Sequence, residues 1–172
     1  MAGLTAGVPG NDEAVTADAG SDCYELDITR ICDAPPGRVY QAFTDPDKLA
    51  RWFGPPGWHV SRESVQIDAR PGGRLRFMLA NAEDPSLSSA VDAEFIEVAD
   101  GELLVGVQAA GSRPGQHDAS GQMILRLEFH REAGSKTLLV LRQGPYDFEG
   151  EARAREGWNS SFSKLDEVLA EA

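Results

Sequence analysis

The sequence is poor in the side chains on which metal binding and nucleophilic catalysis most often depend. Its 172 residues include only 3 histidines and 2 cysteines, and these occur in none of the spacings H-x-x-x-H, C-x-x-C or H-E-x-x-H that are typical of metal sites. The sequence also lacks a G-x-S-x-G nucleophile elbow and a phosphate-binding loop. We therefore expect no metal and no cofactor, and the sequence favours binding of a ligand over catalysis.

Basic residues and long apolar runs are scarce as well. The chain has 16 Lys and Arg against 28 Asp and Glu, a net charge of -12, whereas binding to nucleic acid or to an anionic membrane depends on clustered Lys and Arg. No apolar run approaches the roughly 18 residues of a membrane span, and the first residues lack the basic start and apolar core of a secretory signal. We expect a soluble cytoplasmic protein, a monomer or weak dimer, that binds neither nucleic acid nor membranes.

What is present indicates a single globular domain. The composition is 41% hydrophobic and 26% charged, and a chain of this length can bury a core without disulfides. Cys23 and Cys32, on one extended strand, would lie roughly 30 Å apart at about 3.3 Å per residue, which is too far to pair. Residues 1–21 hold few large apolar side chains, which predicts a disordered tail. The predicted domain spans residues 22–172.

Alternation of apolar and polar residues predicts seven strands. In residues 23–32, Tyr24, Leu26 and Ile28 alternate with polar residues, as a half-buried strand requires. Further segments of similar character are separated by turn signals such as Asp100-Gly101; they span residues 64–68, 74–79, 90–98, 103–110, 122–130 and 136–143. Their short connections predict an antiparallel meander.

Three segments carry helical signals instead. Residues 35–44 and 45–53 predict two short helices, the second with Asp45 as its N-cap and Pro46 at its first position. Residues 151–171 predict a long helix, because large apolar residues recur there at steps of 4, 3 and 4. These residues are Trp158, Phe162, Leu165 and Leu169.

Three stretches in this order resemble the SRPBCC superfamily, also called START-like or Bet v 1-like, in the subgroup labelled activator of Hsp90 ATPase homologue. They read ITRICDAPPGRVYQAFTDPDKLARWFGPPG, RPGGRLRF and EGWNSSFSKLDEVL. The resemblance implies an α+β helix-grip fold. In that fold a curved seven-stranded antiparallel sheet surrounds the long C-terminal helix, two short helices follow the first strand, and a cavity lies between sheet and helix. The superfamily includes ligand carriers, cyclases, receptors and co-chaperone domains, so the fold alone does not give the function.

Aromatic side chains supply the candidate walls of this cavity, although core packing alone would explain most of them singly. In the stretch LARWFGPPGWHV we expect a corner at residues 54–57, with Trp58 and His59 at the cavity entrance. His59 could donate a hydrogen bond or act as a base. The direction of Gln108 and Arg142 stays open. The predicted ligand-binding set is Trp52, Phe53, Trp58, His59, Phe77, Phe95, Gln108, Arg142, Trp158 and Phe162.

Flat aromatic walls favour non-enzymatic binding of a bulky apolar or aromatic natural product, such as a polyketide or an enediyne. The composition is similar to that of self-resistance proteins of the calicheamicin type, which bind an enediyne antibiotic and are cleaved in its place. An unhindered glycine Cα is the expected point of radical attack, and Gly111 is the first candidate, with Gly106, Gly115 and Gly121 behind it.

Two other functions remain open. The first is a polyketide cyclase or dehydratase that uses His59, or an inward Arg or Asp, as an acid-base group. The second is an interaction module that resembles the Hsp90 co-chaperone domain.

Overall fold

A single antiparallel sheet and three α-helices form the described part of the computed structural model, residues 23–109 and 122–171. The predicted disordered tail, residues 1–21, lies outside the described residues, as do Gly111, Gly115 and Gly121. In chain order the strands are β1 (Tyr24–Cys32), β2 (Trp58–Val60), β3 (Gln66–Ile67), β4 (Arg74–Asn81), β5 (Ser88–Ala99), β6 (Leu103–Ala109), β7 (Gln122–Glu132) and β8 (Lys136–Tyr146). The helices are α1 (Pro36–Thr44), α2 (Pro46–Trp52), the 3-10 turn η1 (Arg62–Ser64) and α3 (Phe148–Ala170).

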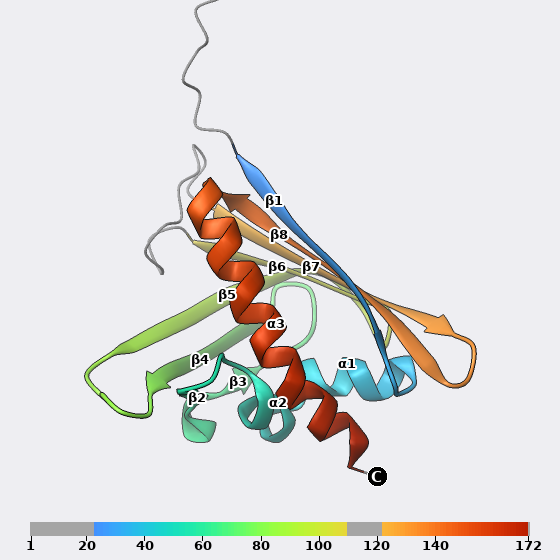
Figure 1. The fold of residues 1–172 in the computed structure, drawn as a ribbon. Helices are drawn as coiled ribbons and strands as arrows, with labels where there is room; N and C mark the ends of the chain where they lie inside the picture. The colour runs from blue at the N-terminus through green and yellow to red at the C-terminus, as the bar shows by residue number, and fades with distance from the viewer. Residues whose placement is uncertain (1–22, 110–121, 172) are drawn as a thin grey trace, which may run out of the picture.

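The sheet confirms the helix-grip fold. Its strand order is β1-β8-β7-β6-β5-β4-β2, a path of seven strands, and the two-residue β3 pairs with β4 beside it. Every pairing is antiparallel. Figure 1 shows α3 lying across one face of the curved sheet, with α1 and α2 near its C-terminal end. No described helix is long and apolar enough to cross a membrane.

One strand of that path was not predicted. The segment expected as a strand at residues 64–68 contains only β3, because η1 occupies its start. The seventh strand is β2, in which Trp58 pairs with Asn81 and Val60 with Leu79. Three residues are too few to show an alternating pattern, so β2 exists only through its long-range pairing with β4.

Local signals placed the helices correctly. The Asp45 carboxylate caps α2 by accepting hydrogen bonds from the backbone N–H groups of Asp47 and Lys48, at 2.9 and 3.3 Å. The long helix α3 begins three residues before the predicted start at residue 151. Asp147 is its N-cap and accepts a hydrogen bond from the Gly150 N–H.

The core is fully packed where α1 and α2 meet α3, and we call this region the closed end. Trp52 is 0% exposed there, and its indole Nε1–H donates to the carbonyl oxygen of Ala42 at 2.8 Å. The Phe43 ring meets the Trp52 ring edge to face at 4.9 Å, and Phe162 lies nearly parallel to Trp52 at 6.5 Å. Trp52 and Phe162 border no empty space in the described part of the chain, whereas Phe43 also lines an inner cavity between the sheet and α3.

Candidate functional site

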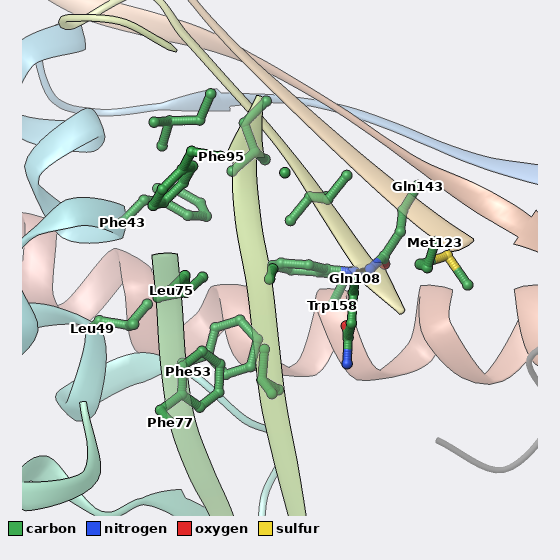
Figure 2. A pocket seen from close by; sticks show the side chains of 16 residues that line it. Phe43, Leu49, Phe53, Leu75, Phe77, Phe95, Gln108, Met123, Gln143 and Trp158 are labelled. Carbon is green, nitrogen blue, oxygen red and sulfur yellow. Dashed lines mark hydrogen bonds between the residues drawn. The ribbon is translucent and has the colours of Figure 1, made fainter. Parts of the chain in front are cut away.

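An apolar cavity of about 80 Å³ lies between the sheet and α3 (Figure 2). Inward-facing positions of β4 to β8 supply most of its wall, and α1, α2 and α3 close it. Because successive residues of a strand face opposite sides, Leu75 and Phe77 both point inward from β4. The lining residues are Phe43, Leu49, Phe53, Leu75, Phe77, Val91, Ala93, Phe95, Leu104, Gly106, Gln108, Met123, Leu125, Leu127, Gln143 and Trp158.

Phe53 and Trp158 form one side of this inner cavity. Phe53 is the C-cap residue of α2, with extended backbone angles of -67° and 135°, so its side chain leaves the helix and turns toward the sheet. Its ring meets the Phe77 ring edge to face at 4.9 Å and the Trp158 ring at 5.5 Å. Phe53, at the end of α2, therefore contacts one aromatic side chain of β4 and one of α3 at this wall.

Two glutamines are the only polar side chains that line the inner cavity among the described residues. The Oε1 atom of Gln143 accepts a hydrogen bond from the Trp158 Nε1–H at 2.8 Å. The Nε2 group of Gln108 is buried and has no hydrogen-bond partner. Figure 2 shows both amides near Met123, at the end of the cavity opposite Phe43 and Leu49. The cavity is thus apolar along its length and polar at one end.

A wider groove of about 400 Å³ lies on the other side of the same wall. Phe53 and Trp158 line both the inner cavity and the groove. Trp58 of β2 and Leu79 of β4 line the groove but not the inner cavity. Gly157 of α3 also faces the groove, and a Cβ added to it would meet no atom within 4 Å. The remaining lining residues are Gly54, Pro55, Ser89, Tyr146, Gly150, Arg153, Ala154 and Ser161.

Ionisable groups are sparse at both hollows. None of the 16 side chains around the inner cavity is ionisable, and Tyr146 and Arg153 are the ionisable residues lining the groove. Within residues 23–109 and 122–171, no three His, Cys, Asp or Glu side chains lie close enough to hold a metal ion. Burial raises the pKa of the Cys32 thiol to about 11, so this thiol stays protonated near neutral pH and is a poor nucleophile.

The structure brings half of the predicted ligand-binding residues together. Phe53, Phe77, Phe95, Gln108 and Trp158 line the inner cavity, and Gln108 points inward. Trp58 lies in the groove wall, next to the predicted corner.

Two predicted residues belong to the core instead. Trp52 and Phe162 are buried but line neither hollow, because both pack into the closed end. Trp52 therefore does not border either of the two hollows.

Two others point away from the interior. Arg142 is exposed, and its Nε–H donates to the Asp27 carboxylate at 3.3 Å. The alternation of β8 explains this direction, since the neighbouring residues Leu141 and Gln143 are buried. His59 is exposed on β2 between Trp58 and Val60, and it lines neither hollow.

Gln143 was not among the predicted residues, although the sequence contains a signal for it. On β8 the buried positions Leu139 and Leu141 are followed two residues later by Gln143. A polar residue on an otherwise apolar face indicates either a buried hydrogen bond or a ligand contact. Here its Oε1 atom holds the indole of Trp158.

Comparison with known proteins identifies a family that this chain matches. A family model described as Activator of Hsp90 ATPase homolog 1-like protein matches residues 33–170. The chain is similar to the crystal structure of a protein from Chromobacterium violaceum, with 24% identity and a TM-score of 0.71 over 86% of this chain and 98% of that one. It is also similar to the AHSA1 protein from Silicibacter pomeroyi, with 24% identity and a TM-score of 0.68 over 86% and 98%.

An AHSA1-like protein from Aeromonas hydrophila, solved in solution, is 20% identical, with a TM-score of 0.65 over 84% of this chain and 92% of that one. At such identities these likenesses establish the fold and not the function. No curated protein sequence matches the chain.

Proposed function

The chain belongs to the family of activator of Hsp90 ATPase homolog 1-like proteins, whose fold often binds hydrophobic ligands, and from this premise we propose that it binds a bulky apolar, aromatic small molecule between its sheet and α3. The observation that carries the proposal is the pair of adjoining hollows that share the wall of Phe53 and Trp158. Small-molecule sites are concave and mainly apolar, with a few polar groups that fix orientation.

The two volumes suggest how such a molecule is held. Known ligand pockets measure about 300–1,000 Å³, so the inner cavity of about 80 Å³ is too small for a polycyclic compound, whereas the groove of about 400 Å³ is large enough. A ligand would place its ring system in the groove, against Trp58 and Trp158. Movement of the Phe53 side chain would admit one end of the ligand to the inner cavity.

The flat faces of Phe53, Trp58 and Trp158 favour fused aromatic rings, and we include natural products of the polyketide or enediyne type in the proposed ligand class. Sequestration of such a toxic compound would protect the producing cell. Self-sacrificial cleavage is a separate part of the hypothesis. Incubation with an activated enediyne should yield two chain fragments in mass spectrometry, with a new end near Gly111, or at Gly106 in the cavity wall. A chain that stays intact would remove cleavage and leave binding untouched.

Binding can be tested by tryptophan fluorescence, because two of the three tryptophans line the groove. Titration with two- to four-ring aromatic compounds, among them tetracyclic polyketides and an enediyne, should quench the emission of Trp58 and Trp158 and raise the unfolding temperature. A panel in which no member changes either quantity would overturn the proposal.

Gly157→Leu tests whether the ligand binds in the groove. The added side chain would enter the groove, since its Cβ meets no atom within 4 Å, so ligand affinity should fall by at least about tenfold, equivalent to about 1.4 kcal/mol. Gly37→Leu is the matched variant, since Gly37 is also a helical glycine at which an added Cβ would meet no atom within 4 Å, yet it lies outside the groove. Affinity should be unchanged in Gly37→Leu. Equal affinities in the two variants would place the ligand elsewhere.

The family description itself favours a second candidate, an interaction module for the Hsp90 chaperone. Its test is a pull-down with purified Hsp90, followed by measurement of the ATPase rate with and without this protein. Complex formation together with a raised ATPase rate would support this candidate. The absence of both effects would rule it out.

A further inference from the structure

Gln108 carries a buried donor that the protein itself leaves unused. The residue is 8% exposed, and its Nε2 group is the one buried side-chain nitrogen or oxygen of the described residues that lacks a hydrogen-bond partner. Buried polar groups in proteins are nearly always paired, since an unpaired donor loses its hydration without replacement. An exception of this kind requires an explanation.

The position of Gln108 presents its side chain to the inner cavity. Gln108 lies on β6, in register with Ala93 of β5 and Met123 of β7, and all three line the cavity. Figure 2 shows the Gln108 side chain among the lining residues, near Met123 and Trp158.

Gln143, the other glutamine of the cavity wall, differs from Gln108 because it already has a hydrogen-bond partner. Gln143 is held by the Trp158 indole through a hydrogen bond of 2.8 Å, so its Oε1 atom already has a donor. The polar end of the cavity therefore offers one fixed amide and one unpaired N–H group. This arrangement suits a ligand that brings a hydrogen-bond acceptor.

The absence of ionisable side chains around the inner cavity limits which acceptor a ligand can place there. None of the side chains that line the inner cavity is ionisable, so a carboxylate or phosphate placed there would be a buried charge without a counterion. An uncharged carbonyl oxygen meets the requirement of Gln108 without this penalty.

We propose that Gln108 is the polar anchor of the site and that the ligand inserts an uncharged carbonyl group, such as that of an aryl ketone, into the inner cavity. The carbonyl oxygen accepts the hydrogen bond of Gln108 Nε2–H, and the aromatic body of the ligand lies in the groove beyond Phe53. This inference rests on the proposed binding function and names the chemical class of its ligand.

Three naphthalene derivatives test the inference, because they share one ring system and differ at one end. They are 2-acetylnaphthalene, its isostere 2-isopropenylnaphthalene, in which a methylene group replaces the carbonyl oxygen, and the charged 2-naphthoate. The wild-type protein should bind the ketone about tenfold more tightly than the alkene, as one hydrogen bond to a buried donor predicts. It should bind 2-naphthoate more weakly than either.

Gln108→Leu should abolish this preference and bind the ketone and the alkene alike, because the donor is gone. Gln66→Leu is the matched control, the same substitution at an exposed strand position that lines neither hollow; it should keep the tenfold preference. In infrared spectra the carbonyl stretch of the bound ketone should lie at lower frequency in the wild type than in Gln108→Leu. Thermal unfolding of each variant checks that it is folded.

The outcomes separate the two proposals. Equal affinity of the wild type for the ketone and the alkene would overturn the role of Gln108 and leave aromatic binding intact. Failure of the wild type to bind any of the three compounds, or any aromatic compound of the larger panel, would overturn both proposals.

Discussion

Trp52 and Trp158 have the same side chain and opposite surroundings. At the closed end, Trp52 is 0% exposed, its N–H donates to a backbone carbonyl, and Phe43 packs on its ring. On the side of the hollows, Trp158 borders empty space on two sides, and its N–H is held by Gln143, a residue of the cavity wall. The difference teaches that the presence of an aromatic residue does not mark a binding site in this fold. Incomplete packing around that residue does.

The largest effect should come from truncation at the closed end. We expect Trp52→Ala to lower the free energy of unfolding by about 3–5 kcal/mol, because it removes a fully buried indole and leaves a cavity. Urea denaturation followed by circular dichroism measures this change. A loss below about 1 kcal/mol would contradict the view that this end is fully packed.

Small added side-chain groups, two methyl groups at Ala42 and one at Gly157, should then separate the two regions. Ala42 is 0% exposed beside Trp52, so Ala42→Val should cost about 1–3 kcal/mol through overpacking. Gly157→Ala should instead stabilise the protein by up to about 1 kcal/mol, since the new Cβ enters open space and alanine favours the helix. Differential scanning calorimetry should show a lower unfolding temperature for Ala42→Val and a higher one for Gly157→Ala. Shifts of the same sign would contradict the difference in packing between the closed end and the groove.

Trp58 lies between these extremes. Because Trp58 is partly exposed and lines only the groove, Trp58→Ala should weaken binding of 2-acetylnaphthalene more than it lowers stability, whereas Trp52→Ala should harm both. The comparison needs a titration and a urea curve for each variant. A stability loss for Trp58→Ala as large as that of Trp52→Ala would assign Trp58 to the core.

The smallest effect is expected on the outer face of the sheet. The ion pair of Arg142 with Asp27 is exposed at both partners, and exposed pairs contribute about 0–1 kcal/mol. Arg142→Ala should therefore change neither ligand affinity nor, beyond this amount, stability. His59→Ala should leave affinity unchanged as well. A clear loss of affinity in either variant would show that the ligand extends outside the two hollows.

Local signals in the sequence were enough for much of the fold. Asp45 and Pro46 placed the start of α2, and the spacing of Trp158 and Phe162 gave the buried face of α3. These features depend on residues a few positions apart, which a sequence displays directly. β2 could not be found in this way, because its three residues are a strand only by pairing with Asn81, Ala80 and Leu79.

The candidate site depended more on long-range packing. The alternation of β8 decides that Gln143 faces inward and Arg142 outward, and this direction becomes certain only when the pairing with β7 is known. Likewise, no local pattern distinguishes Trp52 from Phe53. They are adjacent in the sequence, and the end of α2 sends one ring into the closed end and the other to the cavity wall. The chemical types of the lining could be predicted, but the boundary between core and cavity could not.

The two edges of the sheet have a consequence for self-association. An exposed edge strand can recruit another chain through its unpaired backbone groups, which is a common origin of aggregation. Here one edge is formed by two short strands, β2 with three residues and β3 with two. The other is β1, where the Arg155 side chain on α3 donates to the backbone carbonyl of Asp27 at 3.1 Å and occupies an acceptor of that edge. Both features reduce the number of backbone groups that the sheet offers for strand addition.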